Sequence, residues 1–192
     1  MSMQVNPVTG WLSNVEHRPS AHFSARPAGV DISLLVIHNI SLPPGQFGTG
    51  HIQQFFLGSL DVNAHPYFDQ IAELRVSAHF LIERDGKITQ FVSCLDRAWH
   101  AGKSCFAGRD NCNDFSVGVE LEGTDDQSYT QQQYVSLIAV TQALRAAFPS
   151  IVPERITGHE HIAPGRKTDP GPYFDWAYYR TQLLNTAPGG PR

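Results

Sequence analysis

Residues 33–40 read SLLVIHNI, a short apolar run rich in β-branched side chains, and this run predicts a buried β-strand. A second run, SVGVELEG at 116–123, alternates between apolar and acidic residues. Its aliphatic side chains would face one way, and Glu120 and Glu122 would face the other.

Helices are expected after and between the strands. Thr130 followed by Gln133 matches a capping box and predicts a helix at 131–148, while Asp175 would cap a last helix at 176–184. Three further elements are a short helix at 50–60, a hairpin at 78–92 around Asp85-Gly86, and a strand or strand end at 155–162. The whole pattern predicts an α/β fold: a single-domain, central mixed β-sheet flanked by helices.

Chain length and composition favour one folded domain. At about 150 residues per domain, 192 residues give a single unit over 1–192, with its core at about 30–185. The last residues, TAPGGPR at 186–192, are expected to be a frayed tail. Hydrophobic residues make up 41% of the chain, which argues against disorder.

Charge and hydropathy exclude two classes of partner. The net charge of −4 lacks the basic stripe that a phosphate backbone requires, so nucleic acid is not expected. No apolar run approaches the roughly 18 residues of a membrane span, and the start, MSMQVNPVTGWLSN, has no secretory pattern. Cys94, Cys105 and Cys112 form no CxxC pair and no export signal is visible, so we expect free thiols in a reducing cytoplasm. The chain is separately expected to be a monomer.

His38 stands near the end of the first predicted strand. Ligands of open α/β sheets collect at the carboxyl ends of strands, which makes this histidine a candidate ligand. A lone histidine at such a position is more often a hydrogen-bonded core or rim residue. The choice depends on finding partners elsewhere in the chain.

Partners are present in TGHEHIAPGRKTDPGP, residues 157–172. This segment holds His159, His161, Lys167 and Asp169, and in an extended segment the last two side chains point to one face. Two histidines and a carboxylate would suit a catalytic zinc ion, which takes three protein ligands and keeps a fourth position for water. An ordinary Asp–Lys surface pair explains the spacing equally well.

Glu120 is the candidate acid and base. Its strand is otherwise apolar, and desolvation there would raise the pKa of the carboxyl and suit it to accept and return a proton. Pairing with a nearby arginine is the alternative. Glu122 shares the face but lies nearer the strand end, so it is expected to be solvated.

A series of motifs occurs in order along the chain from about residue 8 to 185: HNISLPPGQFG, NAHPYF, LRVSAHFLIERDGKI, RAWHAG, NDFSVGVELEGTD, TGHEHIAPGRKTDPGP and FDW. Together, and in this order, these motifs resemble those of the AmpD family of bacterial zinc N-acetylmuramoyl-L-alanine amidases. The resemblance implies the fold of T7 lysozyme and peptidoglycan-recognition proteins.

The resemblance implies a site, residue by residue. His38, His159 and Asp169 match the positions of zinc ligands, and Glu120 and Lys167 match the catalytic positions. Glu120 would take the proton of the attacking water and deliver it to the departing amine. Lys167 would stabilise the developing oxyanion.

The implied substrate is a muropeptide of cell-wall recycling. The resemblance indicates hydrolysis between the lactyl group of 1,6-anhydro-N-acetylmuramic acid and L-alanine, with one Zn²⁺ per chain. A muropeptide-binding module without hydrolysis is the alternative class, although retention of the whole residue set argues against it. A purely structural metal, with four closed ligands, is a third interpretation.

Further positions resemble those that surround the substrate in the family: Asn39, Tyr67, Arg75 and Trp99. An aromatic ring offers a sugar a stacking face, and an arginine can grip a carboxylate with two hydrogen bonds. Asn111 stands where some relatives have a basic residue, so the sequence does not identify the residue that would bind the substrate's carboxylate. Arg109, two positions earlier, is the alternative candidate.

Three other histidines and two loops remain to be assigned. The resemblance favours His159 over His161 as the ligand, and it makes His79 a core residue. His100 could line the cleft or simply pack there. The segments 41–66 and 96–114 are long enough to act as lids.

Overall fold

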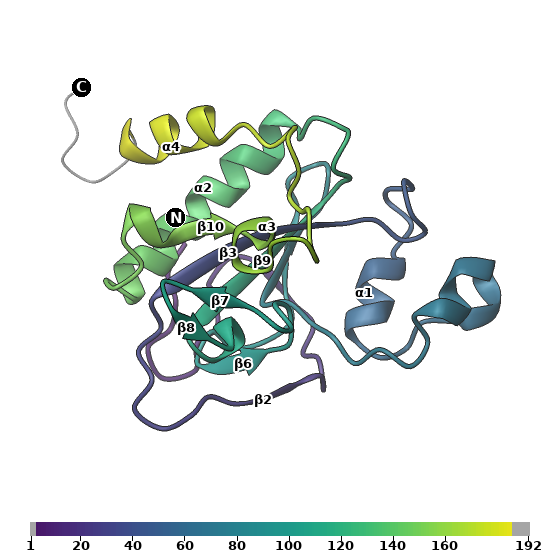
Figure 1. Cartoon of the computed structure of the whole chain (residues 1–192), viewed down its shortest axis with the longest axis horizontal. Helices are drawn as coiled ribbons and strands as arrows, with labels where there is room; N and C mark the ends of the chain where they lie inside the picture. Colours follow the sequence, from purple (N-terminus) through teal and green to yellow (C-terminus); the bar gives the residue numbers. More distant parts are fainter. Residues whose placement is uncertain (1–2, 186–192) are drawn as a thin grey trace.

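A six-stranded sheet lies at the centre of the computed structural model, in the order β1-β5-β4-β9-β3-β10 (Figure 1). The structure describes residues 3–185, so the tail predicted at 186–192 lies outside the described residues. Strands β3, β4, β9 and β10 are parallel, whereas β5 is antiparallel to β4. The sheet strands are β1 (Glu16–His17), β3 (Leu34–Ile40), β4 (Phe80–Ile82), β5 (Ile88–Gln90), β9 (Ser116–Glu122) and β10 (Ile156–Gly158). The predicted α/β class is confirmed.

One face of the sheet is apolar and is covered by two long helices. Leu35 and Ile37 of β3 pair with Val117 and Val119 of β9 and join the largest buried cluster. Helices α2 (Gln131–Ala147) and α4 (Trp176–Asn185) pack apolar side chains into the same cluster and lie side by side in Figure 1. Burial of this face fixes the strand register, since a slip by one residue would expose it.

The opposite face carries the polar residues that the sequence singles out. His38 pairs in register with Glu120, so both side chains point to this face. The residues between 98 and 115 cover it, together with the short helix α3 (His159–Ile162). The covering segment contains the hairpin of β7 (Cys105–Phe106) and β8 (Arg109–Asp110) and a 3-10 helix, Cys112–Asp114.

A separate apolar cluster supports the end of the molecule that carries helix α1 (His51–Phe56), on the right in Figure 1. Two 3-10 helices follow α1, at Val62–Ala64 and Pro66–Gln70. The remaining elements are the pair of β2 (Phe23–Ala25) with β6 (Asp96–Ala98) and a 3-10 helix at Pro153–Arg155. None of the described helices is both long and apolar enough to cross a membrane.

Most predicted elements occur where the local patterns put them. The capping box of Thr130 and Gln133 is present at the start of α2, and Asp175 accepts a hydrogen bond from the Tyr178 N–H at the start of α4. Helix α1 is shorter than predicted because the chain turns at Gly58, whose φ is 70°. Cys94, Cys105 and Cys112 are free thiols.

Two predicted elements need correction. The strand expected at 155–162 ends at Gly158, and α3 begins at His159. The hairpin around Asp85-Gly86 is not a two-residue turn: Gly86 N–H donates to Glu83 O, Glu83 N–H donates to Lys87 O, and only Gly86 of the pair has positive φ. This arrangement is a three-residue loop with a glycine bulge.

Glu122 is buried, so its predicted solvation is wrong. Only 3% of its surface is exposed. The carboxylate accepts hydrogen bonds from Gly48 N–H at 2.6 Å and from Arg84 N–H at 3.1 Å. The loop after β3 and the hairpin after β4 fold over the strand end and bring these donors. Glu122 therefore ties two loops to the sheet.

The Glu122→Ala variant should be about 2–3 kcal/mol less stable than the parent chain, because two backbone N–H groups lose a charged acceptor. Urea denaturation in the presence of a chelator measures this difference without a contribution from metal. Glu154→Ala, at an exposed position, is the control and should change stability by less than about 0.5 kcal/mol. Equal stability of both variants would contradict the assigned role.

Candidate metal centre

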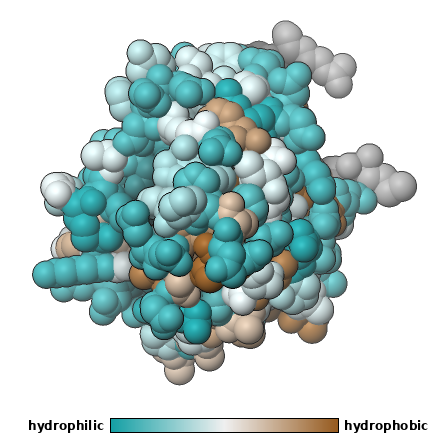
Figure 2. All heavy atoms as spheres, turned by 90° about the vertical axis from the view of Figure 1, so that its right-hand side faces the viewer, coloured by the Kyte–Doolittle hydropathy of each residue, from teal (hydrophilic) through white to brown (hydrophobic). Residues whose placement is uncertain are grey.

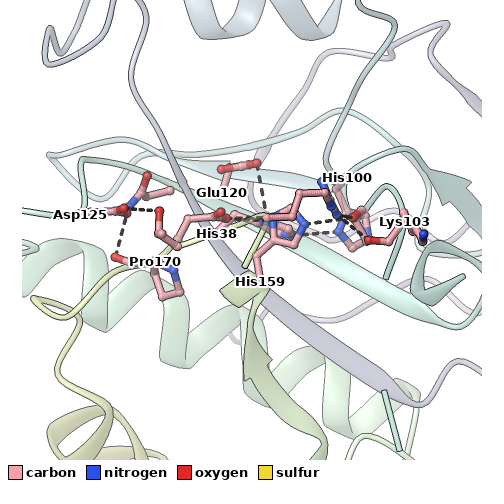
Figure 3. Close-up of polar contacts among 12 residues, drawn as sticks. His38, His100, Lys103, Glu120, Asp125, His159 and Pro170 are labelled. Atoms are coloured by element: carbon pink, nitrogen blue, oxygen red, sulfur yellow. Dashed lines mark hydrogen bonds and ion pairs between the residues drawn. The ribbon is translucent and has the colours of Figure 1, made fainter. Parts of the chain in front are cut away.

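Three side chains from separate parts of the chain converge at the carboxyl ends of the parallel strands. His38 comes from β3, His159 from the junction of β10 and α3, and Asp169 from the loop after α3. Nδ1 of His38 lies 2.9 Å from Nδ1 of His159, and Oδ2 of Asp169 lies 3.0 Å from each of these nitrogens. Figure 3 shows the two rings next to each other.

The chemistry of these three atoms fits a cation. Nε2 of His159 faces the Ala101 carbonyl at 3.0 Å, and a carbonyl only accepts, so the neutral ring carries its proton on Nε2. Nδ1 of His159 then directs a lone pair at the carboxylate. Burial lowers the pKa of His38 to about 4, so the His38 ring is neutral near pH 7. The convergence of two imidazole lone pairs and a carboxylate oxygen is the arrangement that a divalent metal ion would stabilise.

A polar network holds the loop that bears Asp169. The Asn39 amide donates to Asp125 Oδ1 at 2.8 Å and to the Pro170 carbonyl at 3.1 Å, and Tyr129 OH donates to the same carbonyl. Thr168 Oγ1 donates to the other oxygen of Asp125. Asp125 therefore bridges the end of β3 to the ligand loop, a role that no local sequence pattern signals.

Glu120 lies beside the three ligand atoms without belonging to them. Its Oε1 is 4.0 Å from Nδ1 of His38, and its side chain is 12% exposed. Among the described residues, no hydrogen-bond partner meets its buried Oε2. Burial raises the pKa of Glu120 well above its usual range; the Asp169 carboxylate adds to this rise and Lys167 opposes it.

A cavity of about 390 Å³ opens over these groups. Glu120, His159, Lys167 and Asp169 line its polar side, and Lys167 is exposed. The opposite wall is mainly apolar and comes from α1 and its neighbours; its residues include Leu42, Pro44, Phe55, Phe56, Ile71, Leu74 and Val76. Figure 2 views this end of the molecule, where apolar side chains lie among a largely hydrophilic surface.

The four residues predicted around the substrate lie in different places. Tyr67 and Trp99 line the cavity, and Trp99 donates from Nε1 to Ser24 Oγ. Asn39 also lines it, although its amide protons are engaged in the ligand-loop network. Arg75 is exposed and lines a smaller, neighbouring hollow with Leu60 and Val62.

The remaining candidate residues separate clearly. His79 is fully buried and accepts a hydrogen bond from Gly118 N–H on Nδ1, as befits a core histidine. His161 is 62% exposed and pairs with Glu160 at 3.4 Å, away from the three ligand atoms. The Arg109 guanidinium stacks 4.0 Å from the Phe115 ring centroid. Asn111 lines a different cavity.

His100 lines the cavity and also packs against the candidate metal ligand His38. It therefore occupies both of the positions that the sequence allowed, at the cleft and in a packed environment. Its Nδ1 lies 2.8 Å from Nε2 of His38, and its Nε2 lies 3.1 Å from Ser116 Oγ. Burial lowers the pKa of His100 well below its usual range. Sequence reasoning found His100 but not the polar partners around it.

Comparison with known proteins gives one consistent family. Residues 26–172 match the sequence profile of the N-acetylmuramoyl-L-alanine amidase family. A 1,6-anhydro-N-acetylmuramyl-L-alanine amidase, AmpD, from Citrobacter freundii is 58% identical over 171 residues, which cover 89% of this chain and 91% of the relative.

Solved structures give the same result. The crystal structure of a selenomethionine derivative of AmpD aligns with a TM-score of 0.88 and 57% identity, over 90% of this chain and 96% of that one. The Escherichia coli amidase AmiD, in complex with the substrate anhydro-N-acetylmuramic acid-L-Ala-D-γ-Glu-L-Lys, aligns with a TM-score of 0.59 and 26% identity. That alignment covers 94% of this chain and 65% of AmiD.

The His159→Ala and His161→Ala variants distinguish the two histidines of one helix. Removal of His159 should abolish stoichiometric binding of a divalent metal, because only two of the three converging donors remain. Removal of His161 should leave binding unchanged. Elemental analysis of dialysed protein measures the metal content of each, and equal losses in both variants would contradict the geometry.

Proposed function

Because this chain belongs to the N-acetylmuramoyl-L-alanine amidase family, we propose that it uses zinc to cleave 1,6-anhydro-muropeptides between the lactyl group and L-alanine. Nine-tenths of the chain aligns with an amidase named for that substrate. The AmiD complex supports an anhydro-muramyl peptide as the class of ligand. The observation that carries the proposal is the unpartnered Glu120 oxygen beside three converging ligand atoms.

The donor set supports zinc as the metal. Zinc binds imidazole nitrogen and carboxylate oxygen at about 2.0–2.2 Å, which puts tetrahedral ligand atoms roughly 3.3 Å apart. The three atoms lie 2.9–3.0 Å apart, so a shift of a few tenths of an ångström would suffice. His38, His159 and Asp169 would hold the ion, which would supply Lewis-acid polarisation of the amide carbonyl and the attacking water.

Glu120 is suited to move the proton. Its raised pKa makes the carboxylate a better base than a solvated glutamate, and an oxygen of this cavity-lining side chain would accept the proton of the attacking water. The same oxygen would then return the proton to the L-alanine nitrogen, which must leave as a neutral amine. A binding module without hydrolysis has no need of a buried carboxylate held in this state.

Lys167 is suited to stabilise the negative charge that develops on the carbonyl oxygen. It lines the same cavity as Glu120 and Asp169, and its exposed side chain is free to approach the substrate. An ammonium group beside the carbonyl oxygen stabilises the tetrahedral state more than the neutral amide, which lowers the barrier.

The cavity is suited to a substrate with a sugar and a peptide. Tyr67 and Trp99 offer ring faces to the sugar, and the apolar wall can pack against the lactyl and alanyl methyl groups. Arg75 lies outside the cavity, so it would meet only a peptide that extends beyond it.

We place the reaction in the cytoplasm, in keeping with three free thiols. We also take residues 1–192 as one domain that acts as a monomer.

Mass spectrometry of the products tests the proposed reaction. The purified chain should release the intact peptide, with a free L-alanine amino group, from an anhydro-muropeptide. A chelator should abolish the release, and one equivalent of Zn²⁺ should restore it. Cleavage at another bond, or full activity in the chelator, would overturn the proposal.

The Glu120→Gln variant should retain one zinc per chain and lose about 10²–10⁴-fold in kcat, because the amide cannot accept the proton of water. Steady-state hydrolysis and elemental analysis on the same sample separate the two effects. Glu154→Gln, a distant exposed substitution, should match the parent in both. Loss of the metal together with activity would remove the proton-transfer role.

The Lys167→Ala variant should lower kcat about 10²–10³-fold with unchanged zinc content, because one positive group leaves the oxyanion position. Lys103→Ala is the matched control, since Lys103 is an exposed lysine that lines a different cavity. Similar rates for both lysine variants would show that Lys167 takes no part in the reaction.

A further inference from the structure

The ring nitrogens of His38 and His159 that face away from the metal centre both contact one dipeptide, His100-Ala101. Nε2 of His38 faces Nδ1 of His100 at 2.8 Å, and Nε2 of His159 faces the carbonyl oxygen of Ala101 at 3.0 Å. The two ligands come from residues 121 positions apart, yet the groups behind them are adjacent in the chain. In the view of Figure 3, His100 lies on the side of His38 away from Asp125 and Pro170.

The two supports differ in what they permit. The Ala101 carbonyl only accepts, so it fixes the proton of His159 on Nε2 and leaves Nδ1 free. His100 has two tautomers. If its proton is on Nε2, directed at Ser116 Oγ, its Nδ1 accepts from His38 and frees Nδ1 of His38 for a metal. If the proton is on Nδ1 of His100, the proton of His38 is forced onto the metal-facing nitrogen.

Three features hold the dipeptide in place. Asn113 is 6% exposed, and its Oδ1 accepts from both backbone N–H groups, at 3.1 Å from His100 and 2.8 Å from Ala101. Arg166 Nη2 donates to the Ala101 carbonyl. A Cβ at Gly118 would lie 2.5 Å from the His100 ring, so the ring packs directly on the backbone of β9.

We propose that the His100-Ala101 dipeptide, anchored by Asn113, sets the proton position and ring orientation of both histidine ligands. His100 and Asn113 are positioning residues, because they act on the metal through His38 and His159. The inference rests on the metal binding proposed above. Groups behind metal-binding histidines usually change metal affinity about 10–100-fold when they are removed.

Paired substitutions at His100 test the proposal. His100→Phe keeps a ring over Gly118 but has no acceptor, so it should weaken Zn²⁺ binding about 10–100-fold in competition with a chromogenic chelator. His100→Asn lacks the ring but can place an oxygen near the position of Nδ1, and it should recover most of the affinity. A purely structural role predicts the opposite order, since the smaller side chain would leave the larger void.

Asn113→Ala provides a second test, in which His100 and all three candidate ligands keep their native side chains. It should weaken Zn²⁺ binding at least as much as His100→Phe, because both backbone N–H groups lose their acceptor. His22→Phe is the matched control: a buried histidine stacked on Trp99, whose replacement should leave zinc affinity unchanged.

The outcomes separate this inference from the function it rests on. If the parent chain binds no zinc, both fail. If the parent binds zinc and the His100→Phe and Asn113→Ala variants bind it equally well, the metal site stands and the positioning role is overturned. The role is also overturned if His100→Asn binds no better than His100→Phe. Thermal unfolding of the metal-free variants verifies that each compared protein is folded.

Discussion

The site depends on one electrostatic constraint: two imidazole nitrogens and a carboxylate oxygen lie about 3 Å apart in a region shielded from water. Without a cation, or protons in its place, these lone pairs repel one another, and burial strengthens the repulsion because the local dielectric is low. The parallel strands β3 and β10 bring the histidines together, and the loop after α3 brings the carboxylate. The metal binding that we propose would therefore be coupled to the fold of this edge.

The rest of the protein keeps these groups in place. On one side of the sheet, the apolar contacts with α2 and α4 hold β3 and β9 in the register that pairs His38 with Glu120. On the other side, small residues of β9 leave room for His100. Asp125 and Asn39 secure the ligand loop. Each contact is modest, but the geometry of a metal site requires all of them at once.

Local patterns predicted the sheet, the long helices and their caps because period and capping chemistry are written in neighbouring residues. They could also place His38 at a strand end and Glu120 on a strand face. They failed where the outcome depends on distant segments: Glu122 is buried by two loops that arrive from elsewhere, and His161 turns outward because α3 begins one residue after β10. The roles of Asp125 and Asn113 were invisible for the same reason, since their partners lie far away in sequence. Family resemblance supplied the ligand set, which spacing alone left open.

Anomalous diffraction at the zinc absorption edge, from crystals of the zinc-loaded protein, would locate the metal itself. We expect one peak within about 2.0–2.2 Å of Nδ1 of His38, Nδ1 of His159 and Oδ2 of Asp169, with a coordination position open toward Glu120. A peak on His161 or a cysteine, or a fourth protein ligand closing the site, would disprove this metal centre.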